Sequence, residues 1–173
     1  MASEQDISKS DRILSEIKLL RERQKITDVD EPQLQVVMFS LAGDMYAFPG
    51  RNVLEILPRE EVSPIPGTPS CIIGLIIVRG DIESVVDLGK ILDLPATEGR
   101  ESFVLLAASG TVRSGVQIDQ VEDVVEVPQS AILAAPATLD SGIREFVAGQ
   151  FEHDGKSVTL LDLEKIFAQV AAA

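Results

Sequence analysis

Acid–base and nucleophilic chemistry would have to come from very few side chains in this sequence. His153 is the single histidine and Cys71 the single cysteine among 173 residues. His153 lies in the polar segment 152–156, which is typical of a hairpin turn, whereas a catalytic histidine needs an orienting partner. Cys71 has no basic neighbour in the sequence that would stabilise a thiolate, so we expect a small buried side chain. Neither residue predicts catalysis.

Paired carboxylates could in principle support hydrolysis. Four acids lie close together in the sequence: Asp119, Glu122, Asp123 and Glu126. Valines alternate with them in a way that is typical of a short element with one exposed side. We therefore keep a small carboxylate-dependent hydrolase only as a remote alternative. One histidine and one cysteine cannot assemble a usual zinc site, and no phosphate-binding or dinucleotide glycine motif is present. We expect no enzymatic activity, no metal and no cofactor.

Arg79 is the charged residue whose position most needs an explanation, because it is the only charge between Glu61 and Asp81. It follows the aliphatic run 75–78, which predicts a buried strand. A cation at the end of such a strand is costly unless it has an acidic partner or a role at an exposed edge. We therefore expect Arg79 either to form an ion pair or to contact another protein.

The composition limits the classes of partner. The net charge is −13, and residues 33–173 carry nine Lys/Arg against twenty Asp/Glu. Such an acidic body repels phosphate backbones and anionic lipids, so we expect no nucleic acid partner and no direct membrane insertion. No apolar run approaches the roughly 20 residues of a membrane span. The single cysteine suits a reducing compartment, and we expect a cytoplasmic protein.

The elements that must position these residues begin with a helix over residues 3–26, in which Ile7, Leu14, Ile17 and Leu20 recur near the helical period. Residues 27–32 then form a linker, and we treat residues 1–32 as one region. The apolar side of the helix must pack on the body, on a second copy or on an extra partner. A short hairpin over residues 37–48 follows, then an amphipathic segment at 52–57 and a rigid, proline-rich connection at 58–70. Further strands are predicted at 74–79, 82–87, 102–108, 112–118, 145–151 and 157–161, and a terminal helix at 163–172.

An internal repeat organises these strands. The segment 85–92 recurs as 160–167 with four of eight residues identical, and each copy ends a strand with an Asp that can cap the following helix. A weaker match relates Gly43 to Gly110 and Glu55 to Asp123 at nearly constant offsets. We infer two copies of one unit, over approximately 36–95 and 100–167. Each alone would be marginally stable, so a shared core is expected between paired small β-barrels.

Five motifs follow one another along the chain: Val53-Leu54-Glu55-Ile56, Ile65-Pro66-Gly67-Thr68-Pro69, Gly74-Leu75-Ile76-Ile77-Val78-Arg79-Gly80, Val85-Val86-Asp87-Leu88, and Gly115-Val116-Gln117-Ile118-Asp119. Together they resemble the CheW family of chemotaxis coupling proteins, and the resemblance covers about residues 34–168. The sequence departs from the family pattern at Ile77 and Val78, which replace an Asn-Leu pair, and at Ser84, which replaces a common proline.

The resemblance implies an all-β fold with short helices: two SH3-like, five-stranded β-barrel subdomains that share a core, with N-terminal and C-terminal helices added. It also implies a non-enzymatic adaptor that binds the cytoplasmic tips of chemoreceptors and the regulatory domain of a CheA-type histidine kinase. Residues 33–173 would form this CheW-like domain. The partner-binding residues implied by the matching positions are Arg79, Glu55, Val53, Ile56, Ile77 and Gly80.

Two alternatives remain open from the sequence. A protein with the same fold could act as a scaffold or decoy in a non-chemotactic or polar-localisation system, with helix 3–26 recruiting a further partner or a second copy. Within the fold, Glu55 and Arg79 could form a purely structural ion pair, or the same two residues could contact a partner. An acid that orients Arg79 would serve both roles.

Overall fold

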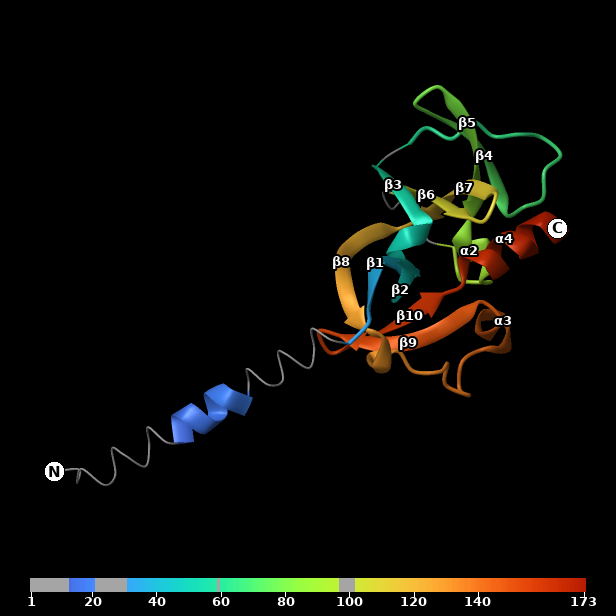
Figure 1. The fold of residues 1–173 in the computed structure, drawn as a ribbon. Helices are drawn as coiled ribbons and strands as arrows, with labels where there is room; N and C mark the ends of the chain where they lie inside the picture. Colours follow the sequence, from blue (N-terminus) through green and yellow to red (C-terminus); the bar gives the residue numbers. More distant parts are fainter. Residues whose placement is uncertain (1–12, 21–30, 59, 97–101) are drawn as a thin grey trace, which may run out of the picture. The chain divides into compact units, whose positions relative to one another are not determined.

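The computed structural model describes residues 13–20, 31–58, 60–96 and 102–173 (Figure 1). Residues 34–173 form one compact unit, distinct from residues 1–33. Of the helix predicted over 3–26, residues 13–20 are helical and the remainder lies outside the described residues. No helix in the described parts of the chain is long and apolar enough to cross a membrane.

Ten strands, three short α-helices and two 3-10 turns follow in the described chain after residue 32. They are β1 (Gln33–Leu41), β2 (Asp44–Pro49), η1 (Gly50–Asn52), β3 (Val53–Pro58), β4 (Ile72–Val78), β5 (Asp81–Asp87), α2 (Leu88–Ile91), β6 (Phe103–Ser109), β7 (Val112–Ile118), β8 (Gln120–Pro128), η2 (Gln129–Ala131), α3 (Ser141–Arg144), β9 (Val147–His153), β10 (Lys156–Leu161) and α4 (Leu163–Ala172).

The strands form two five-stranded sheets. We call them sheet A, with the order β8-β1-β2-β10-β9, and sheet B, with the order β3-β6-β7-β5-β4. Exchanging each strand for its counterpart five strands away in the chain converts the order of sheet A into that of sheet B: β1 and β2 become β6 and β7, and β8, β9 and β10 become β3, β4 and β5. The sequence repeat is therefore also a repeat of topology. Each half contributes strands to both sheets. The bounds 36–95 and 100–167 therefore delimit copies of a sequence unit and do not delimit the two sheets.

The repeated Asp at the end of a strand performs the same task in both copies. Asp87 caps α2 by accepting a hydrogen bond from the backbone N–H of Lys90, and Asp162 caps α4 by accepting one from Lys165. A side-chain acceptor at this position satisfies one of the N–H groups that a helix start leaves without a partner. The capping role predicted from the sequence is confirmed in both copies.

A hydrophobic core lies between the facing surfaces of the two sheets, and each sheet also has a core of its own. The shared core joins Phe39, Phe48 and Leu161 of sheet A to Val86, Leu105 and Val116 of sheet B, and includes side chains from α2 and α4. A second cluster belongs to sheet A and contains Val36, Val127, Phe151 and Val158, while a third belongs to sheet B and contains Leu57, Ile76, Val78, Val85, Val104 and Leu106. Most of the shared core is more than nine-tenths buried.

Two equivalent glycines allow a loop to approach a strand closely. A Cβ on Gly74 of β4 would lie 2.1 Å from the carbonyl oxygen of Ser63. The backbones of Ser63 and Leu75 exchange two hydrogen bonds of 2.8 Å at this point. Gly149 of β9 has the same relation to Leu133, whose carbonyl oxygen would lie 2.8 Å from an added Cβ. Only glycine permits the loop before each edge strand to pair with it.

The predicted fold class is confirmed: the chain is mainly β, with short helices and two five-stranded sheets around a shared core. Each sheet has two edge strands and is not closed by hydrogen bonds, which agrees with an SH3-like fold. Two details differ from the sequence-based expectation. Strand β8 extends over nine residues where only a short element was expected. Strand β9 begins at Val147, two residues later than predicted.

Tyr46, the single tyrosine, predicts a loss of stability at alkaline pH. Burial raises the pKa of Tyr46 from 10 to about 12, and the carboxylate of Asp44 adds to the effect. The unfolded chain therefore ionises first, so this stabilisation is complete below pH 10 and is lost as the pH rises from 10 towards 12. We expect the free energy of unfolding to fall by roughly 1–3 kcal/mol over this window. Tyr46→Phe should remove that part of the pH dependence.

The measurement combines denaturant unfolding at several alkaline pH values with the ultraviolet absorbance of the phenolate. With one tyrosine and no tryptophan in the chain, the absorbance reports Tyr46 alone. Wild type and Tyr46→Phe with the same alkaline dependence would contradict the prediction, as would a phenolate that titrates at its ordinary value in the folded protein.

Candidate functional site

Arg79 lies in the tight turn that joins β4 to β5. The β4–β5 register pairs Val78 with Asp81, which leaves Arg79 and Gly80 as a two-residue loop with φ of +52° and +88°. Two positive φ values define the type I′ turn that suits the twist of a hairpin. The Arg79 side chain is 80% exposed. The sequence predicted a cation at the end of a buried strand, and the structure corrects this to an exposed cation at the tip of a hairpin.

The backbone at Arg79 is unusual for this residue type. Asn, Asp and Gly are the residues that adopt the first position of a type I′ turn most easily. The equivalent β9–β10 turn follows this preference, because it uses Asp154 and Gly155 with φ of +49° and +73°. A long non-glycine side chain in this conformation costs about 1 kcal/mol or more. Arg79 occupies its position against the local backbone preference.

The guanidinium of Arg79 contacts the carboxylate of Glu55, with 3.2 Å between Nη2 and Oε1. Glu55 belongs to β3 and Arg79 follows β4, and these strands are the two opposite edges of sheet B. The ion pair therefore connects the edges and shows that sheet B curls as an SH3-like barrel does. With side chains 80% and 30% exposed, such a pair adds less than about 1 kcal/mol to stability.

A small charged cavity lies beside this pair at the open end of sheet B. Arg113 of β7 contacts the nearly buried carboxylate of Glu83 and lies 3.9 Å from a carboxylate oxygen of Asp81. The cavity is lined by Leu54, Glu55, Val78, Arg79, Asp81, Leu106 and Arg113. Because Arg113 balances Glu83, the buried charge is compensated. The position of Arg79 leaves most of its guanidinium facing solvent.

The strand register divides the six predicted partner-binding residues between two faces of sheet B. Glu55 pairs with Leu106, a member of the core inside sheet B. Ile56 and Val53 pair with Leu105 and Ala107, which belong to the shared core on the other face. Ile77 is on this second face too, because its neighbours Ile76 and Val78 face the inner core. Arg79 and Gly80 form the tip where the two faces meet.

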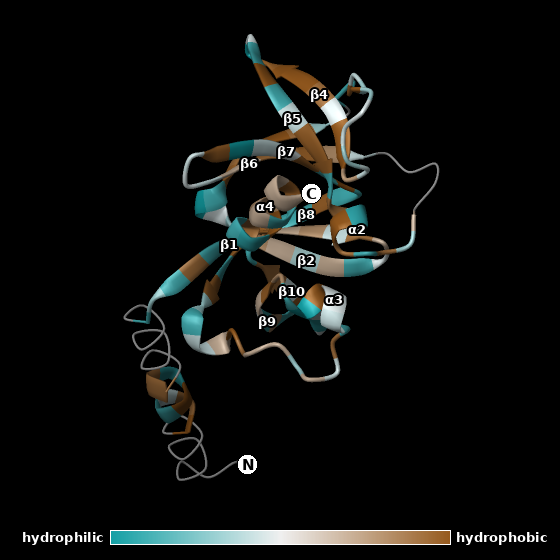
Figure 2. Ribbon diagram, turned by 90° about the vertical axis from the view of Figure 1, so that its right-hand side faces the viewer, coloured by the Kyte–Doolittle hydropathy of each residue, from teal (hydrophilic) through white to brown (hydrophobic). Residues whose placement is uncertain are grey.

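An exposed apolar row extends across the outer face near this tip. Ile77 pairs directly with Ile82, and the two residues are 72% and 69% exposed. The β6–β7 register pairs Ser114 with Ala107 of the shared core, so Val112, two residues before Ser114, lies on the same face, and it is 48% exposed. Figure 2 shows the hairpin projecting from the body, hydrophobic along β4 and hydrophilic at its tip. An apolar row on a projecting hairpin is a surface that another protein can cover.

The sequence analysis did not identify Ile82 and Val112 as candidates. A signal for Ile82 was present, because a two-residue turn at Arg79-Gly80 makes Ile77 and Ile82 cross-strand neighbours. To place Val112 in the same sheet as Ile82 required the parallel pairing of β5 with β7, which joins strands from different halves of the chain. Local pattern contains no information on that pairing.

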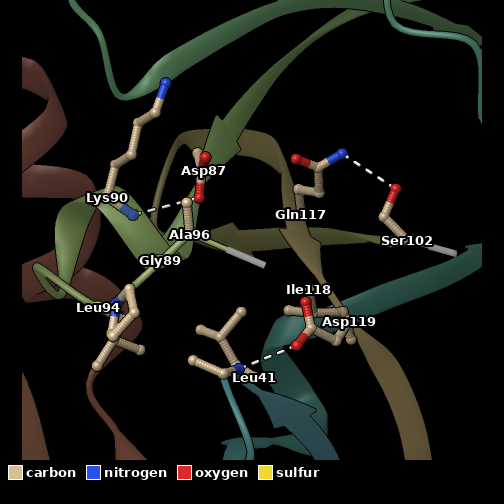
Figure 3. A pocket seen from close by; sticks show the side chains of 12 residues that line it. Leu41, Asp87, Gly89, Lys90, Leu94, Ala96, Ser102, Gln117, Ile118 and Asp119 are labelled. Atoms are coloured by element: carbon tan, nitrogen blue, oxygen red, sulfur yellow. Dashed lines mark hydrogen bonds between the residues drawn. The ribbon is translucent and has the colours of Figure 1, made fainter. Parts of the chain in front are cut away.

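A separate cavity of about 240 Å³ lies where sheet A meets sheet B, as Figure 3 shows. Its polar side chains are already engaged in holding the fold. The ammonium of Lys90 donates to the carbonyl oxygen of Ser70 at 3.1 Å, and the amide of Gln117 donates to the hydroxyl of Ser102 at 3.1 Å. Asp119 accepts a hydrogen bond of 2.9 Å from the backbone N–H of Ala42. The polar side chains of this cavity therefore stabilise the region where the two sheets meet.

The residues considered for catalysis have structural surroundings. Asp119 joins the β1–β2 turn to the start of β8, and Asp123 accepts from the neighbouring backbone N–H of Val124. His153 lies 3.5 Å from Asp154 in the β9–β10 hairpin, as the sequence predicted for a turn residue. Cys71 is partly exposed instead of buried, because it precedes the first residue of β4 in the loop. The described chain does not bring these groups into one site.

Comparison with known proteins places this arrangement in a family. The family model of the CheW-like domain matches residues 35–171. The chain belongs to the CheW-like family. The chemotaxis protein CheW of Treponema pallidum (strain Nichols) is 26% identical over 146 residues, which span 81% of this chain and 85% of that protein. Protein FrzA of Myxococcus xanthus is 28% identical over 138 residues, which span 78% of this chain and 86% of FrzA.

The fold agrees with a solved structure of the same family. The crystal structure of the scaffolding protein TtCheW from Thermoanaerobacter tengcongensis superposes with a TM-score of 0.70 at 28% sequence identity, and it covers 79% of this chain and 93% of that chain. The resemblance inferred from the sequence motifs is confirmed. As a CheW-like protein the chain is a non-enzymatic coupling adaptor of the chemotaxis type, and the hydrolase alternative is set aside.

Proposed function

We propose that this CheW-like protein couples the cytoplasmic tips of chemoreceptors to the regulatory domain of a CheA-type histidine kinase. The hairpin tip of sheet B, with Arg79, Gly80 and Glu55, would orient the receptor. Val53, Ile56 and Ile77 on the outer face would supply apolar contact. Residues 33–173 would act as the coupling domain in the cytoplasm, with residues 1–32 as an added helix and linker.

The observation that carries this proposal is the position of Arg79. A structural ion pair does not require an arginine in a turn where Asn or Asp fits better, and an 80% exposed guanidinium gains little from Glu55 alone. Backbone strain that is retained at an exposed residue indicates that the side chain of that residue has a function. Arginine is also among the residues that contribute most strongly to protein interfaces.

Arg79→Asn separates contact from structure. Asn suits the type I′ turn, so we expect the free energy of unfolding to stay unchanged or to rise by up to about 1 kcal/mol. Binding to the cytoplasmic fragment of a chemoreceptor from the same organism is expected to weaken by about tenfold or more, because the exposed guanidinium is lost. Isothermal titration calorimetry and urea unfolding provide the two measurements.

Asp154→Asn is the matched control, because it introduces Asn at the first position of the equivalent turn of sheet A, as Arg79→Asn does in sheet B. It should leave receptor binding within about twofold. Loss of stability in Arg79→Asn without a specific loss of binding would favour the structural interpretation of the ion pair. A capture experiment from the native cytoplasm that recovers neither a CheA-type kinase nor receptors would contradict the coupling function itself.

A second function is favoured by the helix at residues 13–20. Ile13, Ile17 and Leu20 recur at the helical period and form one apolar side of it. Such a side is stabilised by packing on another surface. The alternative is therefore a CheW-like scaffold or decoy in a non-chemotactic or polar-localisation system, in which the helix recruits another protein or a second copy. The same capture experiment distinguishes the two functions by the proteins recovered.

A further inference from the structure

The β4–β5 hairpin continues beyond the strand that pairs with it in sheet B. The ladder between β5 and β7 begins at the pair Val85–Gly115 and extends from there away from the tip. Residues 81–84 of β5 lie on the other side of this pair, in the part of the hairpin that projects from the body (Figure 2). Two strands alone are at most marginally stable, so side-chain contacts must help to set the direction of this part. That direction decides where the guanidinium of Arg79 faces.

Arg113 of β7 makes such contacts with β5. Its Nη2 atom contacts the carboxylate of Glu83 and lies 3.9 Å from a carboxylate oxygen of Asp81. Asp81 and Glu83 are two residues apart, so their side chains lie on the same face of the strand. Glu83 is only 8% exposed, and a carboxylate so deeply buried needs a compensating cation. Arg113 therefore connects β7 to the first residues after the Arg79–Gly80 turn.

The internal repeat shows how the same place is built in sheet A. There β10 is the counterpart of β5, and β2 is the counterpart of β7. The pair Leu160–Ala47 corresponds to Val85–Gly115, because Leu160 is the repeat of Val85. The ladder of sheet A continues from this pair towards the β9–β10 turn, whereas that of sheet B extends in the opposite direction. The two copies thus differ at the positions nearest the tip.

Two residues closer to the turn, sheet A pairs Val158 directly with Met45, and both belong to its apolar cluster. The corresponding positions of sheet B are Glu83 and Arg113. An apolar pair is therefore sufficient to hold these two strands together in this fold. In sheet B a cavity of about 320 Å³ lies beside the charged pair, and Arg113 and Arg79 both line it. The ion pair thus accompanies the open end of the sheet at which Arg79 lies.

We propose that Arg113 is a positioning residue for Arg79. Through Glu83 and Asp81 it holds the tip of the β4–β5 hairpin at a distance from β7, which keeps the cavity open and the guanidinium of Arg79 exposed beside Glu55. This inference rests on the proposed receptor contact of Arg79 and names a residue that acts on this contact from another strand. Arg113 itself does not need to touch the receptor.

The test exchanges the charged pair for the apolar pair of sheet A. The double variant Glu83→Val with Arg113→Met removes both charges together, so no buried charge is left uncompensated. We expect its free energy of unfolding in urea to stay close to that of wild type. Binding of the full-length chain to the same chemoreceptor fragment should weaken about three- to tenfold, because affinity falls in proportion to the time that the tip spends outside its binding orientation.

Glu83→Gln with Arg113→Gln is a second double variant, which is also uncharged at these positions but polar. It should weaken binding equally, and it keeps the test decisive if Val and Met pack poorly in sheet B. Both double variants are then made in the Arg79→Asn chain. If Arg113 acts through Arg79, neither should cost more than about a further twofold there.

Wild-type affinity in either stably folded double variant, while Arg79→Asn binds weakly, would overturn the inference and leave the proposed function intact. A larger further loss in the Arg79→Asn chain would also overturn it, because Arg113 would then act on binding independently of Arg79. The same holds if both double variants lose stability along with binding, since the role of Arg113 would then be purely structural. A wild-type chain that binds no receptor fragment overturns the proposed function, and the inference with it.

Discussion

Phe39→Ala is expected to lower the free energy of unfolding by about 3–5 kcal/mol, the largest effect of any single truncation considered. Phe39 is completely buried in the shared core, where its ring lies 5.0 Å from that of Phe48 and 6.1 Å from that of Tyr46, measured between centroids. Its removal leaves a cavity between the two sheets, where neither sheet can move to fill it without losing its own contacts.

Urea unfolding followed by circular dichroism measures this effect, and it should remain a single transition because both sheets depend on the same core. Phe39→Leu is the matched variant, and its smaller change in volume should cost about 1–2 kcal/mol. A loss below about 1 kcal/mol for Phe39→Ala would show that the two sheets are stable independently of one another.

Gly74→Ala is expected to cost about 2–4 kcal/mol, although it adds only one methyl group. The new Cβ would lie 2.1 Å from the carbonyl oxygen of Ser63, and that oxygen belongs to the backbone and cannot rotate away. Either the loop of residues 60–71 separates from β4 and loses both hydrogen bonds between Ser63 and Leu75, or the strand is displaced.

Gly142→Ala provides the control for this substitution. Gly142 lies in α3, and an added Cβ there meets no atom within 4 Å. Alanine is favoured over glycine in a helix, so Gly142→Ala should be neutral or stabilising by up to about 1 kcal/mol. The two variants can be compared by thermal unfolding at one protein concentration. Similar stabilities for Gly74→Ala and wild type would mean that the loop does not need its contact with β4.

Much of the fold could be predicted from local patterns because strands, turns and caps are encoded locally. The hairpin turns and the capping residues Asp87 and Asp162 are examples. Strand β8 was underestimated because it is an edge strand, and Asp123 and Val124 are both exposed there, which breaks the alternation on which recognition depends. The exchange of strands between halves could not be predicted. The hydrophobic pattern of each strand is the same whether its partner strand comes from the same copy or from the other copy.

The candidate site shows the same division between local and long-range information. Arg79 was identified from its isolation in an apolar stretch, and the family resemblance supplied Glu55, which the structure places 3.2 Å away. The row formed by Ile77, Ile82 and Val112 depends on the β4–β5 hairpin and on the parallel pairing of β5 with β7. The sequence alone indicates only the hairpin. The charged neighbours Glu83 and Arg113 come from strands β5 and β7, so their contact also needed the tertiary structure.

The interleaved order of the strands has a consequence for how the protein is made. A ribosome releases β1 and β2 early, yet sheet A gains its next members only when β8, β9 and β10 have emerged, more than 70 residues later. An isolated two-stranded hairpin is at most marginally stable. The edge of β2 that will pair with β10 is therefore uncovered during most of translation, when pairing with another nascent chain competes. The exchange of strands between the two halves thus gives a single shared core. In return, β1 and β2 lack their partner strands until the second half of the chain has been synthesised.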